Sequence, residues 1–171
     1  MSRVRKTRAR TILVAGVVLV VTLSTLLVVA GSSAGSGARM CLGRTATIVG
    51  TSGNDIIYGT NGGDVIVGGR GVDQIHGLGG DDVICGEGGR DILQGGSGDD
   101  ELSGGGSGDA IFGGSGDDFL TGGDGSDDLH GGSGDDYMQG DGFRAFRNDG
   151  CDGGDGIDTA VADCEHLTNV P

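Results

Sequence analysis

From residue 50 to residue 139 the chain divides without gaps into ten units of nine residues, a repeat that limits the possible folds more than any other feature. Every unit begins with Gly, and Gly also fills the fourth place in nine of the ten units. The sixth place is always Asp: Asp55, Asp64, Asp73, Asp82, Asp91, Asp100, Asp109, Asp118, Asp127 and Asp136. The eighth place is always apolar: Ile57, Ile66, Ile75, Ile84, Leu93, Leu102, Ile111, Leu120, Leu129 and Met138. Compositional drift does not keep three columns in phase over this length, so the units are structural repeats.

Each place in the unit has a physical reason. Gly at the first, second and fourth places tolerates a positive φ or a close backbone approach, so the first six residues are predicted to form a tight turn. The last three are predicted to form a strand, with the eighth side chain facing inward and its two neighbours outward. Two units then make one coil, and five coils stacked at the strand spacing would span about 24 Å. The sequence predicts an all-β fold, a right-handed parallel β-roll, which is a β-solenoid of nine-residue Gly/Asp repeats.

Stacked coils of this kind need a cation. Burying one apolar side chain per unit contributes little free energy compared with the conformational entropy lost in ordering nine Gly-rich residues. Stacking also brings the Asp of one unit close to the Asp two units later, for example Asp73 and Asp91, and bare carboxylates there would repel. Ca²⁺ accepts roughly six to eight oxygen ligands from carboxylates and backbone carbonyls. We therefore expect Ca²⁺ binding to be coupled to folding.

The repeat resembles that of the haemolysin-type, or repeats-in-toxin (RTX), calcium-binding proteins, whose motif is Gly-Gly-x-Gly-x-Asp-x-aliphatic-x. Unbroken copies begin at Gly68, Gly95, Gly113, Gly122 and Gly131. A detached copy runs from Gly153 to Val161. The resemblance implies a parallel β-roll that holds Ca²⁺ between the turns of alternate units, with up to eight sites.

The side-chain ligands implied by this resemblance are Asp55, Asp64, Asp73, Asp82, Asp91, Asp100, Asp109, Asp118, Asp127, Asp136 and Asp158. Five residues depart from Gly at the second or fourth place and are expected to weaken their turns: Thr51, Thr60, Leu78, Glu87 and Ser107. Many RTX proteins carry a large catalytic domain before the repeats. This chain looks more like the short secreted members from Gram-positive bacteria.

Residues 1–38 have the three parts of an export signal, namely a basic start, an apolar run over residues 12–30 and small residues after it. The segment is expected to be a signal peptide or, because the apolar run is almost long enough to span a bilayer, an N-terminal membrane anchor. We predict a secreted, extracellular protein, with a cell-surface location if the anchor is retained. Residues 39–49 are expected to form an N-terminal cap, and residues 140–171 a capping loop, the last repeat and a C-terminal tail.

The net charge limits the kinds of molecule that the protein can bind. All 25 acidic residues follow residue 40, and beyond residue 38 they face six Arg, a net charge of −19. Such a field attracts divalent cations and disfavours nucleic acid, and membrane contact is expected only through a retained N-terminal segment.

Four cysteines permit three pairings. We predict Cys151 with Cys164, which leaves Cys41 with Cys85; a zinc site is the alternative.

The sequence contains no recognisable catalytic motif, so we predict calcium ion binding and not enzymatic activity. His76 and His130 both fall at the outward-facing ninth place and are expected to be surface residues. One alternative is an adhesive or surface-structural protein that Ca²⁺ stiffens, with an unidentified protein or glycan partner. A more remote alternative is a secreted enzyme built on the same repeats.

Overall fold

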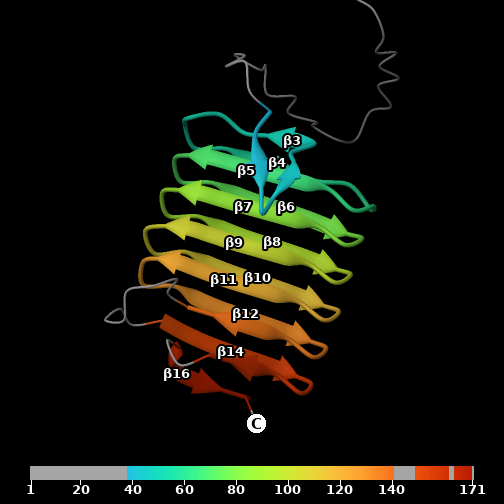
Figure 1. The fold of residues 1–171 in the computed structure, drawn as a ribbon, viewed down its shortest axis with the longest axis vertical. Coiled ribbons are helices and arrows are strands. Elements are labelled where there is room, and N and C mark those ends of the chain that lie inside the picture. The colour runs from blue at the N-terminus through green and yellow to red at the C-terminus, as the bar shows by residue number, and fades with distance from the viewer. Residues whose placement is uncertain (1–37, 141–148, 162–163, 171) are drawn as a thin grey trace, which may run out of the picture.

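The computed structural model describes residues 38–140, 149–161 and 164–170, and in them the chain winds back and forth between two parallel seven-stranded sheets (Figure 1). Sheet I consists of β4 (Ile56–Tyr58), β6 (Gln74–Gly79), β8 (Ile92–Ser97), β10 (Ala110–Ser115), β12 (Asp128–Ser133), β14 (Asp149–Asp155) and β16 (Cys164–Thr168). Sheet II consists of β3 (Ile48–Val49), β5 (Val65–Arg70), β7 (Val83–Gly88), β9 (Glu101–Gly106), β11 (Phe119–Asp124), β13 (Tyr137–Gln139) and β15 (Thr159–Ala160). The predicted parallel β-solenoid is confirmed.

The strand register confirms that two units make one coil. Ile75 pairs with Leu93, and Leu93 pairs with Ile111, so equivalent places lie side by side at an interval of 18 residues. The predicted division within the unit was wrong, however. Eight of the ten strands that begin in the repeat units have six residues rather than three, because the strand continues through the first three places of the next unit. Between these six-residue strands, only the fourth to sixth places form the turn.

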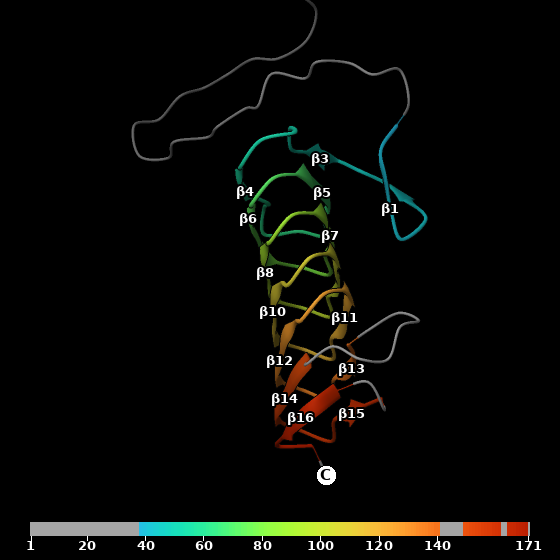
Figure 2. The ribbon, with the colours of Figure 1, turned by 90° about the vertical axis from the view of Figure 1, so that its left-hand side faces the viewer.

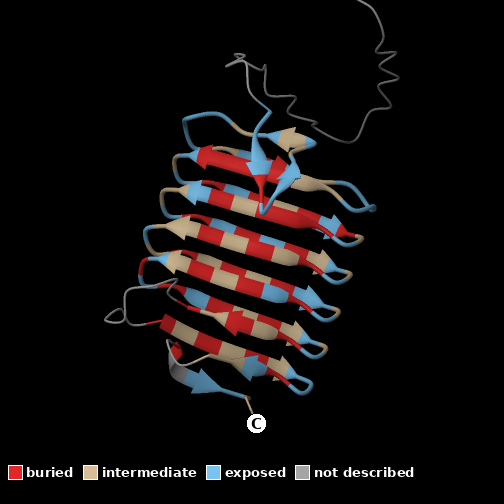
Figure 3. Ribbon diagram, viewed as in Figure 1, coloured by how far each residue is buried: buried red, intermediate tan, exposed pale blue. Residues whose placement is uncertain are grey.

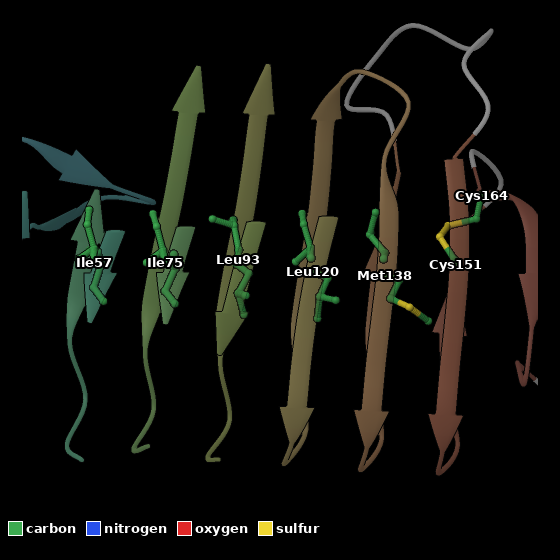
Figure 4. Close-up of a cluster of buried hydrophobic side chains, with 12 residues drawn as sticks. Ile57, Ile75, Leu93, Leu120, Met138, Cys151 and Cys164 are labelled. Carbon is green, nitrogen blue, oxygen red and sulfur yellow. A yellow bond between two sulfur atoms is a disulfide. The ribbon is translucent and has the colours of Figure 1, made fainter. Parts of the chain in front are cut away.

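The apolar residues of the eighth place form one continuous core between the sheets, as predicted. All ten, from Ile57 to Met138, are buried there (Figures 3 and 4). Cys151 and Cys164 extend the same row beyond the tenth unit. The roll therefore buries one narrow column of side chains along its whole length.

Both ends of the roll reach beyond the ten regular units. β3 pairs with β5, which agrees with an imperfect starting unit before residue 50. At the other end, residues 149–152 were assigned to a capping loop, but they belong to β14, which pairs with β12. The register there matches Asp128 with Gly150, an interval of 22 residues, so an insertion of four residues is accommodated without ending the sheet. Residues 141–148 of the proposed capping loop lie outside the described residues.

The hairpin formed by the first described residues lies against the outer face of sheet II and not only at the end of the roll (Figure 2). This hairpin of β1 (Met40–Cys41) and β2 (Arg44–Thr45) is joined to β7 by the Cys41–Cys85 disulfide. Cys41 buries Val67 and Val83 in a second small apolar cluster. Ion pairs of Arg39 with Glu87 and Arg44 with Glu101 hold the hairpin on either side. The hairpin therefore fixes the first coils to one another.

Both predicted disulfides are present. The second joins Cys151 of β14 to Cys164 of β16, and no described cysteine is free. Since all four sulfurs are oxidised, the alternative of a cysteine zinc site is wrong. The predicted signal or anchor lies almost entirely outside the described residues. No described segment forms an apolar helix of membrane-spanning length.

Candidate metal centre

The sixth-place aspartates form two ladders, one along each edge of the roll where the chain crosses between the sheets. The ladder on the edge where the chain passes from sheet II to sheet I contains Asp55, Asp73, Asp91, Asp109, Asp127 and Asp149. The ladder on the other edge contains Asp64, Asp82, Asp100, Asp118, Asp136 and Asp158. All eleven predicted ligands are therefore placed in these two rows.

A hydrogen bond joins each rung of a ladder to the next. The backbone N–H of Asp82 donates to Oδ1 of Asp100 at 2.8 Å, and the N–H of Asp100 donates to Oδ1 of Asp118 at 2.8 Å. The carboxylate is thus oriented by the preceding coil, with one oxygen engaged and the other directed into its own turn. The Asp column is the structural link between coils as well as a row of acids.

Asp149 is a ladder residue that the repeat analysis missed. Its Oδ1 accepts the N–H of Asp127 at 2.8 Å, and its side chain is buried. The four-residue insertion between Gly140 and Asp149 breaks the nine-residue count, which hides Asp149 from a search for a fixed period. A signal was nevertheless present, since Asp149, Gly150 and Cys151 reproduce the sixth, seventh and eighth places of a unit, with Cys151 in the core row.

The second carboxylate oxygen distinguishes most of these aspartates. In eight of them, Oδ2 is buried and has no hydrogen-bond partner among the described residues: Asp73, Asp82, Asp91, Asp100, Asp109, Asp118, Asp136 and Asp158. A buried carboxylate oxygen without a donor is costly unless a cation balances its charge. This regular series of such oxygens therefore points to a ligand.

Other oxygens converge on the same positions. A Cβ placed on Gly68 would lie 2.7 Å from Oδ2 of Asp73 and 3.0 Å from the carbonyl oxygen of Gly86. A Cβ on Gly71 would meet the carbonyl oxygen of Gly53 at 2.5 Å. A side chain on Gly68 or Gly71 would collide with these oxygens, which favours Gly at these two positions.

The donor set suits Ca²⁺. The described residues contain no cluster of three or more His, Cys, Asp or Glu side chains that would enclose a metal by themselves. Backbone carbonyls must therefore supply most ligands, with one or two carboxylate oxygens, and this is a donor set that hard cations with flexible coordination accept. The residues present fit calcium, and the carbonyls and aspartates of adjacent turns are the groups that would hold it.

Burial changes the acidity of the ladder. Desolvation by burial raises the pKa of Asp100 to about 6 and the pKa values of Asp109 and Asp118 to about 7, and neighbouring carboxylates add to this rise. Burial likewise raises the pKa values of Asp73 and Asp91. Without metal, Asp109 and Asp118 are therefore poised to take up protons near neutral pH.

A second, exposed row of carboxylates borders only one of the two ladders. It consists of the fifth-place residues Asp81, Asp99, Asp117 and Asp135. The Oδ1 of each accepts a backbone N–H from the next coil, as from Asp117 to Asp99 at 2.9 Å. The charges of Asp81 and Asp99 contribute to the raised pKa of Asp100. The equivalent places on the other edge are not acidic, for example Val72 and Arg90.

The five departures from Gly fall into two groups. Leu78, Glu87 and Ser107 adopt the positive φ of the glycines that they replace, at 83°, 73° and 87°. Thr51 and Thr60 do not adopt a positive φ, so the backbone of their turns has a different conformation. The first three therefore keep the oxygen arrangement at the cost of backbone strain.

His76 and His130 face outward on sheet I, as predicted. The Nδ1 of His76 lies 2.7 Å from Oε1 of Gln94. The Nε2 of His130 lies 3.3 Å from Oδ1 of Asp128, and the nearest oxygen of Asp152 is 4.0 Å from the opposite ring nitrogen. The two carboxylates approach different ring nitrogens, and these side chains form no metal-binding cluster among the described residues.

Comparison with known proteins agrees with the site. No curated protein and no solved structure matches the chain. A family model of the RTX calcium-binding nonapeptide repeat matches four times, over residues 45–75, 58–93, 86–120 and 103–138, which together cover more than half of the chain. The chain therefore belongs to the family of proteins with RTX calcium-binding nonapeptide repeats.

Proposed function

We propose that this chain is an exported calcium-binding protein whose β-roll folds on, or is stabilised by, Ca²⁺. The observation that carries the proposal is the series of buried Asp Oδ2 atoms beside backbone carbonyls, repeated from Asp73 to Asp158. Calcium supplies the positive charge that these oxygens lack. The sixth-place aspartates hold the coils in register through Oδ1 and present Oδ2 to the cation.

Coupling between binding and folding follows from the cost of the metal-free ladders. Successive carboxylates such as Asp100 and Asp118 lie in adjacent coils, and the pKa of Asp118 is raised first by burial and further by the charges of Asp100 and Asp136. The narrow core offers little burial to offset that repulsion. Ligand binding to the folded state alone stabilises it in proportion to the logarithm of ligand concentration. We expect a loose chain at low calcium and a roll at roughly millimolar calcium, the range of extracellular modules.

Export is supported by the two disulfides and by the N-terminal sequence. Cys41–Cys85 and Cys151–Cys164 would be stable in an oxidising compartment outside the cell. The basic and apolar segment before residue 38 is typical of a signal or anchor. This segment is the observation behind the proposed likeness to short secreted members from Gram-positive bacteria.

A calcium titration monitored by circular dichroism tests the proposal. We expect β-structure to appear cooperatively as Ca²⁺ is added to chelator-treated protein, with Asp118→Asn shifting the midpoint to higher calcium. The control is Asp128→Asn, which removes the same charge from the outer face of sheet I, outside the ladders. A spectrum that stays unchanged up to roughly 10 mM Ca²⁺ would contradict the coupling. Equal shifts in both variants would contradict the assignment of the ladder.

A second candidate function is adhesion through the flat outer faces, stiffened by calcium. Rings stack across strands there, with centroids 4.8 Å apart for Tyr58 and His76 and 5.0 Å apart for Phe119 and Tyr137. Planar side chains in rows suit contact with an extended partner such as a glycan. Binding of cells, glycans or ice by the protein, lost in chelator, would favour this function. The main proposal assigns no catalytic activity, and detection of turnover would overturn that part.

A further inference from the structure

The first two turns of the roll are built differently from the rest. In each, threonine replaces glycine at the second place and closes on the sixth-place aspartate of the same turn. The N–H and Oγ1 of Thr51 donate to Oδ2 of Asp55 at 2.7 and 2.9 Å. The N–H and Oγ1 of Thr60 donate to Oδ2 of Asp64 at 2.7 and 2.9 Å.

The threonines also brace the backbone of their turns. The N–H of Gly53 donates to Oγ1 of Thr51 at 3.1 Å, and the N–H of Gly62 donates to Oγ1 of Thr60 at 3.2 Å. Each hydroxyl thus links the two sides of its turn. The carboxylate is satisfied from within the turn, by groups that are covalently fixed beside it.

In the next turn of each ladder, the equivalent Oδ2 atom has no such donor. Oδ2 of Asp73 and Oδ2 of Asp82, the next residues in the two ladders, have no hydrogen-bond partner among the described residues. Their second-place residues, Gly69 and Leu78, have φ values of 118° and 83°, whereas the threonines lie outside the positive region. Donor hydrogens therefore point at Oδ2 in the first two turns, whereas Oδ2 of Asp73 and Oδ2 of Asp82 receive none from the described residues. A cation would be repelled by those donors and would have to displace two hydrogen bonds in each turn.

We propose that Asp55 and Asp64 hold no calcium, and that threonine hydrogen bonds replace the cation in the first coil, residues 48–67, to make a calcium-independent nucleus. The inference rests on the proposed function, because it divides the ladders into calcium-binding and calcium-free turns. It changes the eleven-residue ligand set implied by the repeat, which loses two members at its N-terminal end.

Other contacts reinforce the same coil. The hairpin bound through Cys41–Cys85 covers Val67 of β5 and Val83 of β7, so the strand that ends the first coil is also fixed from outside. In a solenoid each repeat contacts only its neighbours, and an ordered repeat offers the next one an edge on which to form. Calcium-dependent folding therefore extends from the first coil toward the C-terminus, one coil on another.

The number of bound ions tests the assignment of the sites. Native mass spectrometry of the full chain in Ca²⁺ should give the same ion count for Asp55→Asn/Asp64→Asn as for the unchanged protein. The matched control, Asp100→Asn/Asp118→Asn, should lose at least one ion. Equal losses in the two double variants would overturn the inference and leave the proposed function standing. A chain that takes up no calcium would instead overturn the proposed function, and the inference with it.

Amide hydrogen exchange in chelator tests the nucleus without calcium. We expect amides of residues 48–67 to exchange at least about tenfold more slowly than those of residues 95–139. Thr51→Ala/Thr60→Ala should abolish that difference, because the loss of side-chain hydrogen bonds in both turns, worth about 1 kcal/mol each, amounts to about tenfold or more. The control Ser103→Ala/Thr121→Ala removes hydroxyls from the outer face of sheet II and should leave it unchanged. Uniform exchange along the metal-free chain, or equal effects of the two double variants, would overturn the inference.

Discussion

Acidification should release calcium from the ladders while stabilising the metal-free roll. Burial raises the pKa values of Asp109 and Asp118 to about 7, so Ca²⁺ must displace a proton from each at neutral pH. Lowering the pH from about 7.5 to about 5.5 protonates a carboxyl of that pKa, which weakens its site roughly 25-fold, or by about 1.9 kcal/mol. Two such carboxyls at one site would multiply the effect. Titration calorimetry in buffers of different ionisation enthalpy measures both the affinity and the protons released.

The stability of the metal-free protein should respond to pH in the opposite direction, rising as the pH is lowered. Because the folded pKa values of Asp100, Asp109 and Asp118 are raised, the folded state binds more protons than the unfolded state. The resulting stability is complete below about pH 4, the ordinary range of Asp, and is lost as the pH rises through about 6 to 7. In chelator, lowering the pH from about 7.5 to about 5.5 should therefore raise the content of β-structure seen by circular dichroism. A calcium affinity that is independent of pH, with no proton release, would refute the argument, as would a metal-free roll that weakens on acidification.

Three further changes test the packing and the backbone. Leu102→Ala truncates a fully buried core residue and should lower the free energy of unfolding of the calcium-loaded protein by about 2–5 kcal/mol, measured by urea unfolding. Leu78→Gly relieves a positive φ of 83° at an exposed side chain and should raise stability by about 1 kcal/mol; a loss of stability would contradict the assigned strain. Replacing Cys41 and Cys85 by Ser opens a bridge between residues 44 positions apart and should cost about 4 kcal/mol by the loop-entropy relation. A thermal midpoint unchanged by that replacement would show that the hairpin does not stabilise the first coils.

The period of the sequence was enough to predict the fold and the inward row, because both depend on every ninth residue. The register of Ile75 with Leu93 and the complete burial of both follow directly from that count. The strand length did not follow, because Gly is a poor strand residue by itself and propensity gave the wrong division of the unit. Pairing with identical backbone in the adjacent coils overrides propensity, so residues such as Gly77 join the strands.

The candidate site was predicted where it repeats and missed where it does not. Asp149 escaped because a period cannot be followed through an insertion, although the ladder continues across it. The departures at Thr51 and Thr60 can be read from the sequence, but their hydrogen bonds to Asp55 and Asp64 cannot. The position of the hairpin over Val67 and Val83 could not be predicted from the sequence either, because only long-range packing places β1 on sheet II.

Protons and calcium are alternative ways to neutralise the same buried oxygens, and this fixes how the two ladders respond to their surroundings. A proton satisfies one carboxylate, such as that of Asp109, and leaves the carbonyls around it without a partner. A cation satisfies carboxylate and carbonyl oxygens of adjacent turns together and so also ties one coil to the next. Stability gained from calcium should therefore be cooperative along the roll, whereas stability gained from protons should be a sum over separate residues. The steepness of unfolding in the two conditions should differ accordingly, with the sharper transition in calcium.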